Sequence, residues 1–196
     1  LRHSSAASDV YKRQVLWRFA NKAKINHFGH GAGFYQNLFK NLSLDVRSID
    51  FSFLKTIGST GSPLFKETNI KLSGLFPDTH IISLSGGTDV CTAFIGGNLD
   101  MKVNPGEIQC KMLGASVEVW DDKGNKLENE MGELVLTKPL ITMPVYFWSD
   151  PENKKYKESY FSKFDMIWNH GDWVTETREG GIIVHGRSAV SYTHLT

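Results

Sequence analysis

The segment SGGTDV, Ser85 to Val90, combines two glycines, a hydroxyl and a carboxylate directly after an apolar run. That run, His80 to Ser85, predicts a buried strand, so the glycines would lie where the strand emerges at a ligand-binding edge. Backbone amides without side chains can approach an anion there. The hydroxyl of Thr88 would donate to a phosphate, and Asp89 would bind Mg²⁺, because that ion prefers hard oxygen ligands. A nucleotide-dependent enzyme is therefore the first interpretation.

Purely structural interpretations compete with the chemical ones. A tight turn after a core strand, with Asp89 capping a following helix, also explains Gly-Gly-Thr-Asp. Asp172 in HGDW would equally be a turn aspartate after Gly171. His27 and His30 in HFGH have a spacing that suits a metal, but no further ligand follows closely, so we expect no metal site there.

The composition favours an enzyme that acts on small molecules. Of 196 residues, 22 are Lys or Arg and 21 are Asp or Glu, and no basic run forms a stripe. Neither nucleic acid nor an anionic membrane is therefore expected as a partner. No apolar stretch is long enough to cross a bilayer. The two cysteines, Cys91 and Cys110, form no CxxC pair, which favours free thiols in a reducing cytosol, and hence a cytoplasmic location.

The two ends of the chain break the pattern of the rest. The stretches Leu1–Gln14 and Ala189–Thr196 lack helical and strand periodicity and look like translated sequencing-adaptor read-through, so we exclude them from the fold prediction. The remainder is read as an internal fragment of a longer protein. Its length suffices for one domain of roughly 100 to 200 residues or for two small lobes.

Residues 15–96 alternate short strand-like runs with helical ones, which predicts parallel βαβ units. In the first helical run, Phe34, Leu38 and Leu42 recur on one face and are expected in the core. Ser62 and Pro63 predict the start of the next helix, with Pro63 at or near its first position.

Residues 97–188 are rich in short strand-like runs and turns. The turn Asp121 to Gly124 predicts a hairpin connection. In the insertion VYFWSDPENKKYKESYF, Tyr146 and Trp148 would either line a pocket or pack. The predicted fold class is α/β, with parallel βαβ units from a large N-terminal domain followed by a small β-barrel-like subdomain or meander. The boundary is predicted near Gly96 or Gly97.

Seven short motifs follow one another along residues 15–188. They are TIGSTGSPL (56–64), SGGTDVC (85–91), GEIQC (106–110), MGELVLTKP (131–139), YFW (146–148), HGDW (170–173) and GRS (186–188). In order and spacing this set resembles the acetoacetyl-CoA synthetase family of the adenylate-forming acyl-CoA synthetase superfamily. The resemblance implies that acetoacetate attacks the α-phosphate of ATP, with Mg²⁺, to give an acyl-adenylate and pyrophosphate. The thiol of CoA, the cosubstrate, then displaces AMP.

The resemblance also implies roles for individual residues. Thr88 and Asp89 are the catalytic candidates: Thr88 matches the hydroxyl that touches the phosphate, and Asp89, where relatives usually carry Glu, is the candidate ligand of Mg²⁺. Asp172 matches the aspartate that hydrogen-bonds the ribose hydroxyls. Arg187 matches an arginine at the ribose and phosphate. The remaining cofactor-binding candidates are Gly61, Ser62 and Pro63, which match the loop against the adenine, and Ser83, Leu84, Ser85, Gly86 and Gly87, which flank the nucleotide.

One position bears on the choice of acid. Acetyl-specific relatives carry a Trp where this chain has Gly86, and a glycine leaves room for a longer acyl group. That agrees with acetoacetate and would equally admit butyrate. His27 and Phe28 match a motif near the acyl site and are candidates to face the keto group, although a core histidine is an equal alternative.

Two parts of the superfamily pattern are not matched: the phosphate-gripping Ser/Thr/Gly-rich loop and the C-terminal lid with its catalytic lysine. Because adenylation depends on positioned cations, we expect little ligase activity from this chain without the missing N- and C-terminal parts of its parent. Another short- or medium-chain acyl-CoA synthetase is the nearest alternative. A noncatalytic β-rich module whose aromatic residues bind a sugar or a peptide is an alternative of another class.

Overall fold

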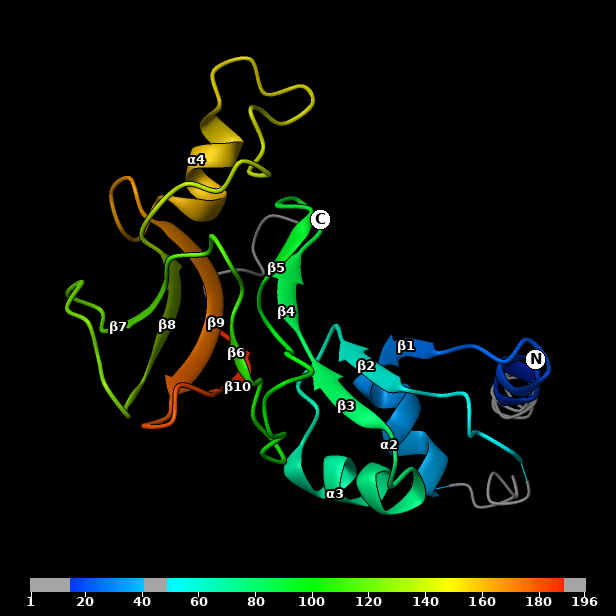
Figure 1. Ribbon diagram of the computed structural model, residues 1–196. Coiled ribbons are helices and arrows are strands. Elements are labelled where there is room, and N and C mark those ends of the chain that lie inside the picture. Colours follow the sequence, from blue (N-terminus) through cyan, green and yellow to red (C-terminus); the bar gives the residue numbers. More distant parts are fainter. Residues whose placement is uncertain (1–14, 41–48, 189–196) are drawn as a thin grey trace. The chain divides into compact units, whose positions relative to one another are not determined.

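A computed structural model describes residues 15–40 and 49–188 (Figure 1). The chain divides into two compact units, 1–83 and 84–196. The segments predicted to be adaptor read-through, together with Leu42, lie outside the described residues. None of the helices in the described part of the chain has the length and hydropathy needed to span a membrane.

The first unit contains a parallel sheet of three strands in the order β1-β2-β3, namely β1 (His27–Gly31), β2 (Thr56–Thr60) and β3 (His80–Ser83). Parallel neighbours require crossover connections, and these contain α2 (Ala32–Lys40) and α3 (Lys66–Leu75). Figure 1 shows both helices against the sheet. The predicted βαβ units are confirmed.

An aromatic cluster forms the core of this unit. Trp17, in a helical segment at 15–22, is fully buried and stacks on Phe28 with ring centroids 4.3 Å apart. Phe34 and Phe76 also contact its indole ring. Phe34 and Leu38 are buried on α2, which confirms the predicted apolar face as far as Leu38.

The helix predicted to open at Pro63 begins later, at Lys66. Leu64 is buried in the core, and Phe65 still has an extended backbone with φ −62° and ψ 148°. The chain is thus still extended at Phe65, two residues after Pro63, and turns into α3 only at Lys66. The predicted helix start is wrong for this reason.

The strand predicted over His80–Ser85 is two strands in two sheets. β3 ends at Ser83, and β4 (Ser85–Gly87) pairs antiparallel with β5 (Thr92–Gly96) in the second unit. β6 (Cys110–Lys111) completes that three-stranded sheet. Because Asp89 lies in the turn between β4 and β5, a strand follows it, and the helix-cap interpretation is wrong.

The second sheet of this unit has four antiparallel strands in the order β10-β9-β8-β7. Their bounds are β7 (Val117–Trp120), β8 (Met131–Leu136), β9 (Trp168–Glu176) and β10 (Ile182–Arg187). Within the described residues both sheets of the unit are open, so the predicted barrel-like closure is not found. Among these residues, in neither sheet does the first strand pair with the last, and that pairing is what closes a sheet into a barrel.

The hairpin connection at Asp121–Gly124 is confirmed. The Asp121 carboxylate accepts from the backbone N–H groups of Lys123 and Asn125 at 2.9 and 2.8 Å, and the φ of Gly124 is +83°. A β-bridge between Trp120 and Lys126 follows the turn.

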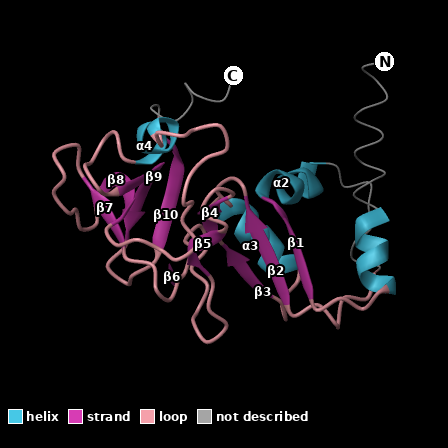
Figure 2. Ribbon diagram, turned by 90° about the horizontal axis from the view of Figure 1, so that it is seen from above, coloured by secondary structure: helices cyan, strands magenta, loops and turns pink. Residues whose placement is uncertain are grey.

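The aromatic insertion contains α4 (Lys154–Tyr160), which packs beside β9 (Figure 2). Tyr156, Tyr160 and Phe161 pack against the core of the unit. By contrast, Tyr146 and Trp148 are 63% and 88% exposed on the preceding loop, where both line an open depression. The insertion therefore combines packed and exposed aromatic residues.

The boundary between the two units falls between Ser83 and Leu84, whereas the composition of the sequence changes near Gly96. Gly96 itself ends β5 and pairs with Cys110 in the second unit. The division of residues 15–188 into an α/β part, 15–96, and a β-rich part, 97–188, stays a prediction.

Candidate functional site

Asp172 and Arg187 lie opposite each other on β9 and β10. The Arg187 guanidinium donates from Nη1 to Oδ1 of Asp172 at 3.1 Å. The Asp172 side chain is 9% exposed, whereas that of Arg187 is 43% exposed. A buried carboxylate requires such a charged donor. Because Asp172 is held within a strand, its interpretation as a turn residue is wrong.

The second carboxylate oxygen of Asp172 faces β4. The Ser85 hydroxyl donates to Oδ2 at 3.4 Å, and Nε2 of His170 lies 3.5 Å from the same oxygen. The second unit thus brings together three of the predicted residues, Ser85, Asp172 and Arg187, from three separate strands.

His170 also belongs to this cluster, although no role for it was predicted from the sequence. It is buried, its ring meets that of Phe94 edge-on at 4.6 Å, and a Cβ added at Gly87 would lie 3.4 Å from its Cε1. Burial lowers the pKa of His170 from 6.5 to about 4, and the charge of Asp172 only partly opposes that shift. The imidazole is therefore neutral at pH 7. Its spacing of two residues from Asp172 on a strand was the available sequence signal.

Thr88 and Asp89 are exposed in the turn after β4. The Tyr160 hydroxyl, from α4, donates to Oδ2 of Asp89 at 2.6 Å. Burial raises the pKa of Tyr160, the bond to Asp89 raises it further, and the charge of Arg187 acts in the opposite direction. The Tyr160 ring stacks on Trp168 of β9 at 3.6 Å. No local sequence pattern indicates a role for Tyr160, because 71 residues separate it from Asp89.

A second group of predicted residues lies in the first unit, at the carboxyl ends of the parallel strands. Gly61 follows β2 with a φ of +78°, and Ser83 is the last residue of β3. Ser62 is exposed and Pro63 half-buried. The carboxyl ends of strands in open parallel sheets are where ligands bind, and the left-handed backbone of Gly61 favours glycine. The nucleotide-binding role of these residues stays a prediction.

His27 and Phe28 lie at the start of β1, at the opposite end of the strands from Gly61 and Ser83. Phe28 is 8% exposed and stacked on Trp17, so packing alone accounts for it. His27 is exposed, with its Nδ1 2.6 Å from the Thr56 hydroxyl. Their predicted contact with the keto group gains no support from these positions.

Gly86 has a structural reason to be glycine. A Cβ at this position would lie 2.6 Å from Cα of Ala93 and would also overlap the carbonyl of Thr92. The register between β4 and β5 shifts at this residue, and the close backbone approach leaves no space for a side chain. The neighbouring Leu84 is 37% exposed.

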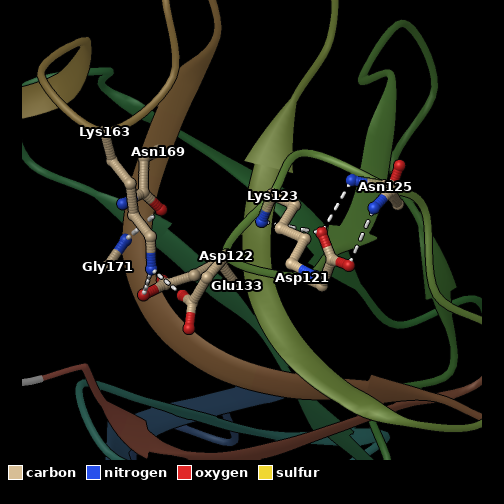
Figure 3. Close-up of polar contacts among 8 residues, drawn as sticks. All are labelled: Asp121, Asp122, Lys123, Asn125, Glu133, Lys163, Asn169 and Gly171. Atoms are coloured by element: carbon tan, nitrogen blue, oxygen red, sulfur yellow. Dashed lines mark hydrogen bonds and ion pairs between the residues drawn. The ribbon is translucent and has the colours of Figure 1, made fainter.

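An ionic network with one fully buried carboxylate, Glu133, lies at β8, the strand next to the one that holds Asp172. The Lys163 ammonium lies 2.9 Å from Glu133 and 2.7 Å from Asp122 (Figure 3). The Glu133 side chain is 1% exposed and sits on β8 opposite Trp173, the neighbour of Asp172. Lys163 also lies over the Trp173 ring at 5.4 Å. The network fixes the segment that follows α4, and with it Tyr160, to the sheet.

Comparison with known proteins gives one consistent result. No protein-family profile matches the chain. It is 42% identical over 175 residues to an acetoacetyl-coenzyme A synthetase of Rhizobium meliloti (strain 1021), an alignment that covers 89% of this chain and 27% of the relative. It is 39% identical over 176 residues to an acetoacetyl-CoA synthetase of Macaca fascicularis, covering 89% and 26%. The chain therefore spans about a quarter of the length of these relatives.

Solved structures agree with the sequence comparison. The acetoacetyl-CoA synthetase from Streptomyces lividans superposes with a TM-score of 0.80 at 38% identity, over 88% of this chain and 27% of that one. The anthranilate CoA ligase AuaEII superposes with a TM-score of 0.76 at 18% identity, over 89% and 32%. The second likeness shows the fold alone.

Proposed function

Because this chain is homologous to a segment of the acetoacetyl-CoA synthetases, we propose that it is the central part of an ATP-dependent acetoacetate–CoA ligase. The observation that carries the proposal is the buried Asp172 carboxylate, held by Arg187 and Ser85 within the motifs HGDW, GRS and SGGTDVC. The parts of the relatives that lie beyond the matched segment would complete the enzyme.

The reaction proceeds in two substitutions. A carboxylate oxygen of acetoacetate attacks the α-phosphorus of ATP, the bond from that phosphorus to the bridging oxygen breaks, and pyrophosphate leaves. The thiol of CoA, having lost its proton, then attacks the acyl carbon, and AMP leaves with the oxygen that joined it to the acyl group. Acetoacetyl-CoA, AMP and pyrophosphate are the products.

Asp172 and Arg187 would bind the nucleotide. The Asp172 carboxylate has two acceptor oxygens for the ribose hydroxyls, and a hydroxyl of the ligand would replace the long hydrogen bond from Ser85, 3.4 Å in length. Arg187 holds Asp172 through Nη1 and keeps nearly half of its side chain exposed, so its other donors would reach the phosphate region.

Thr88 would donate a hydrogen bond to a phosphate of ATP, and Asp89 would bind the Mg²⁺ that accompanies the phosphates. Mg²⁺ usually takes one or two protein carboxylates and completes its shell with phosphate oxygens and water, and the exposed Asp89 fits that demand. In the described residues no three His, Cys, Asp or Glu side chains gather around one point. When bound, the ion supplies positive charge against the developing pyrophosphate.

The other candidate residues are proposed to contact the nucleotide. Gly61, Ser62 and Pro63 would pack against the adenine, and residues 83–87 would flank the nucleotide. Acetoacetate is proposed as the acid from the names of the relatives, since the backbone contact of Gly86 explains that glycine without reference to the acyl group.

The test is pyrophosphate release by the full-length parent protein with ATP and Mg²⁺, comparing acetoacetate, acetate and butyrate. Preference for acetoacetate supports the proposal. Release with another acid retains the ligase and discards the substrate. If the folded parent releases no pyrophosphate with any acid, the ligase is excluded and the β-rich binding module gains support. The 196-residue chain alone is expected to show little activity.

A further inference from the structure

The pairing of β9 with β10 contains an irregularity two residues before Arg187. Val184 pairs with Val174, but the next pair joins Gly186 to Trp173, so His185 is an extra residue opposite no partner of its own. After this β-bulge the ladder is regular again, because Arg187 pairs with Asp172 and the Ser188 amide donates to the Gly171 carbonyl at 2.8 Å.

The bulge decides on which face of the sheet Arg187 lies. Side chains alternate between faces along a strand, and directly paired residues share a face. In an uninterrupted ladder Gly186 would pair with Asp172, and Arg187 would lie on the opposite face from Asp172. With His185 as the extra residue, Arg187 joins the face of Ile182 and Val184 and can reach the carboxylate.

Gly186 is the residue that absorbs the bulge. Its φ is +145°, in a region that residues with a side chain rarely adopt, yet a Cβ at this position would meet nothing within 4 Å. Crowding therefore does not require glycine here, and the backbone conformation does. The extra residue, His185, has its Nε2 2.8 Å from the Thr175 hydroxyl on β9.

We infer that Gly186 is a positioning residue for nucleotide binding, because the bulge that it permits places Arg187 against Asp172. Gly186 itself touches neither the carboxylate nor a ligand. This inference rests on the proposed function, since the consequence of a misplaced Arg187 is measured as weaker ATP binding.

The experiment compares four variants of the full-length parent protein by their ATP KM in pyrophosphate release and by thermal melting. Gly186→Ala is expected to raise the ATP KM on the order of tenfold or more, as loss of a hydrogen bond to a charged group does. Adding Arg187→Ala to it is expected to change little further, because the two substitutions remove the same interaction.

Two variants distinguish misplacement of Arg187 from a general loss of stability. Gly180→Ala is the matched control, since Gly180 lies in the same hairpin with a φ of +84° and nothing within 4 Å of an added Cβ; its ATP KM is expected to stay within about twofold of wild type. Deletion of His185 makes the ladder regular while leaving Arg187 opposite Asp172. In that background Gly186→Ala is expected to be tolerated, with the ATP KM restored.

The outcomes are distinct. If the wild-type parent neither binds nor turns over ATP, the proposed function fails. If the wild type is active and Gly186→Ala matches Gly180→Ala, the inference is overturned. The inference is overturned as well if the variant that combines the His185 deletion with Gly186→Ala folds but does not recover the wild-type ATP KM. This comparison decides the matter even where Gly186→Ala alone does not fold.

Discussion

The Arg187 guanidinium on β10 donates a hydrogen bond of 3.1 Å to Oδ1 of Asp172 on the neighbouring strand β9. The carboxylate is far more buried than the guanidinium. The two side chains therefore form one charged unit. Removing the carboxylate's charge leaves the arginine without its anionic partner in the sheet, so effects at the two positions are expected to be strongly non-additive.

Asp172→Asn is expected to raise the ATP KM of the full-length parent about tenfold to a hundredfold. The amide keeps the shape of the side chain but loses the charge that orients Arg187, and charge-assisted hydrogen bonds are worth about 1.5–3 kcal/mol. Initial rates of pyrophosphate release against ATP concentration measure the change. Asp165→Asn, at an exposed position in the same unit, is the control, and equal ATP KM values in the two variants would contradict a role for Asp172.

The stability of the protein is expected to fall between pH 6.5 and pH 4 because of His170. Its folded-state pKa of about 4 lies below the ordinary 6.5, so in this window the unfolded chain takes up a proton that the folded protein does not. Above pH 6.5 both states are neutral and this contribution is fully present. The loss is at most about 1.4 kcal/mol per pH unit.

Urea unfolding at a series of pH values measures this contribution of His170. The comparison is with His170→Asn, which lacks the titrating group but shares every other one. The variant is expected to have a shallower fall in stability between pH 6.5 and pH 4. Parallel curves for the two proteins would contradict the depressed pKa.

Lys163→Met is expected to destabilise the protein by about 3–5 kcal/mol, because it leaves the Glu133 carboxylate buried without its cation. Guanidinium unfolding measures the free energy. Adding Glu133→Gln should recover much of the loss, since no stranded charge remains. Lys71→Met is the control: Lys71 pairs with Glu67 on the surface of α3, and little change is expected there. Comparable losses in both lysine variants would rule out the buried pair as the cause.

Gly86→Ala is expected to destabilise the protein by about 1–3 kcal/mol, as overpacking against a rigid neighbour does. The added Cβ would meet the backbone of Thr92 and Ala93. Thermal melting measures the effect, and Gly33→Ala, on α2 with nothing within 4 Å of the new Cβ, is the control expected to be neutral or slightly stabilising. A stable Gly86→Ala variant with an altered acetate-to-acetoacetate ratio would instead support the acyl-pocket interpretation.

Local patterns predicted the regular parts of the fold. The apolar face of α2, the parallel strands and the hairpin at Asp121 all follow from periodicity and turn chemistry, which act between near neighbours. The predicted start of α3 was wrong because Leu64 is buried in the core before the helix begins. The predicted end of β3 was wrong because the residues after Ser83 pair with β5 as a separate strand, β4. Such tertiary contacts leave no mark on the local sequence.

In the candidate site, too, local motifs predicted some residues and tertiary contacts determine the others. Motifs identified Asp172, Arg187 and Ser85, which the structure brings together. They gave no role to Tyr160, and none to His170 although it begins HGDW, because the roles of both depend on burial and on contacts between distant segments. The extra residue His185 is equally invisible in the sequence, because a bulge is defined by two strands and not by one.

The stack of Tyr160 on Trp168 has one more consequence. Tyr160 donates to Asp89, the proposed metal ligand, and its ring lies flat on an indole. A ligand at Asp89 that displaces the Tyr160 hydroxyl would therefore also shift the ring that covers the Trp168 indole. In a variant whose other four tryptophans are replaced by Phe, the fluorescence of Trp168 would then report occupancy of the turn without a label and without turnover.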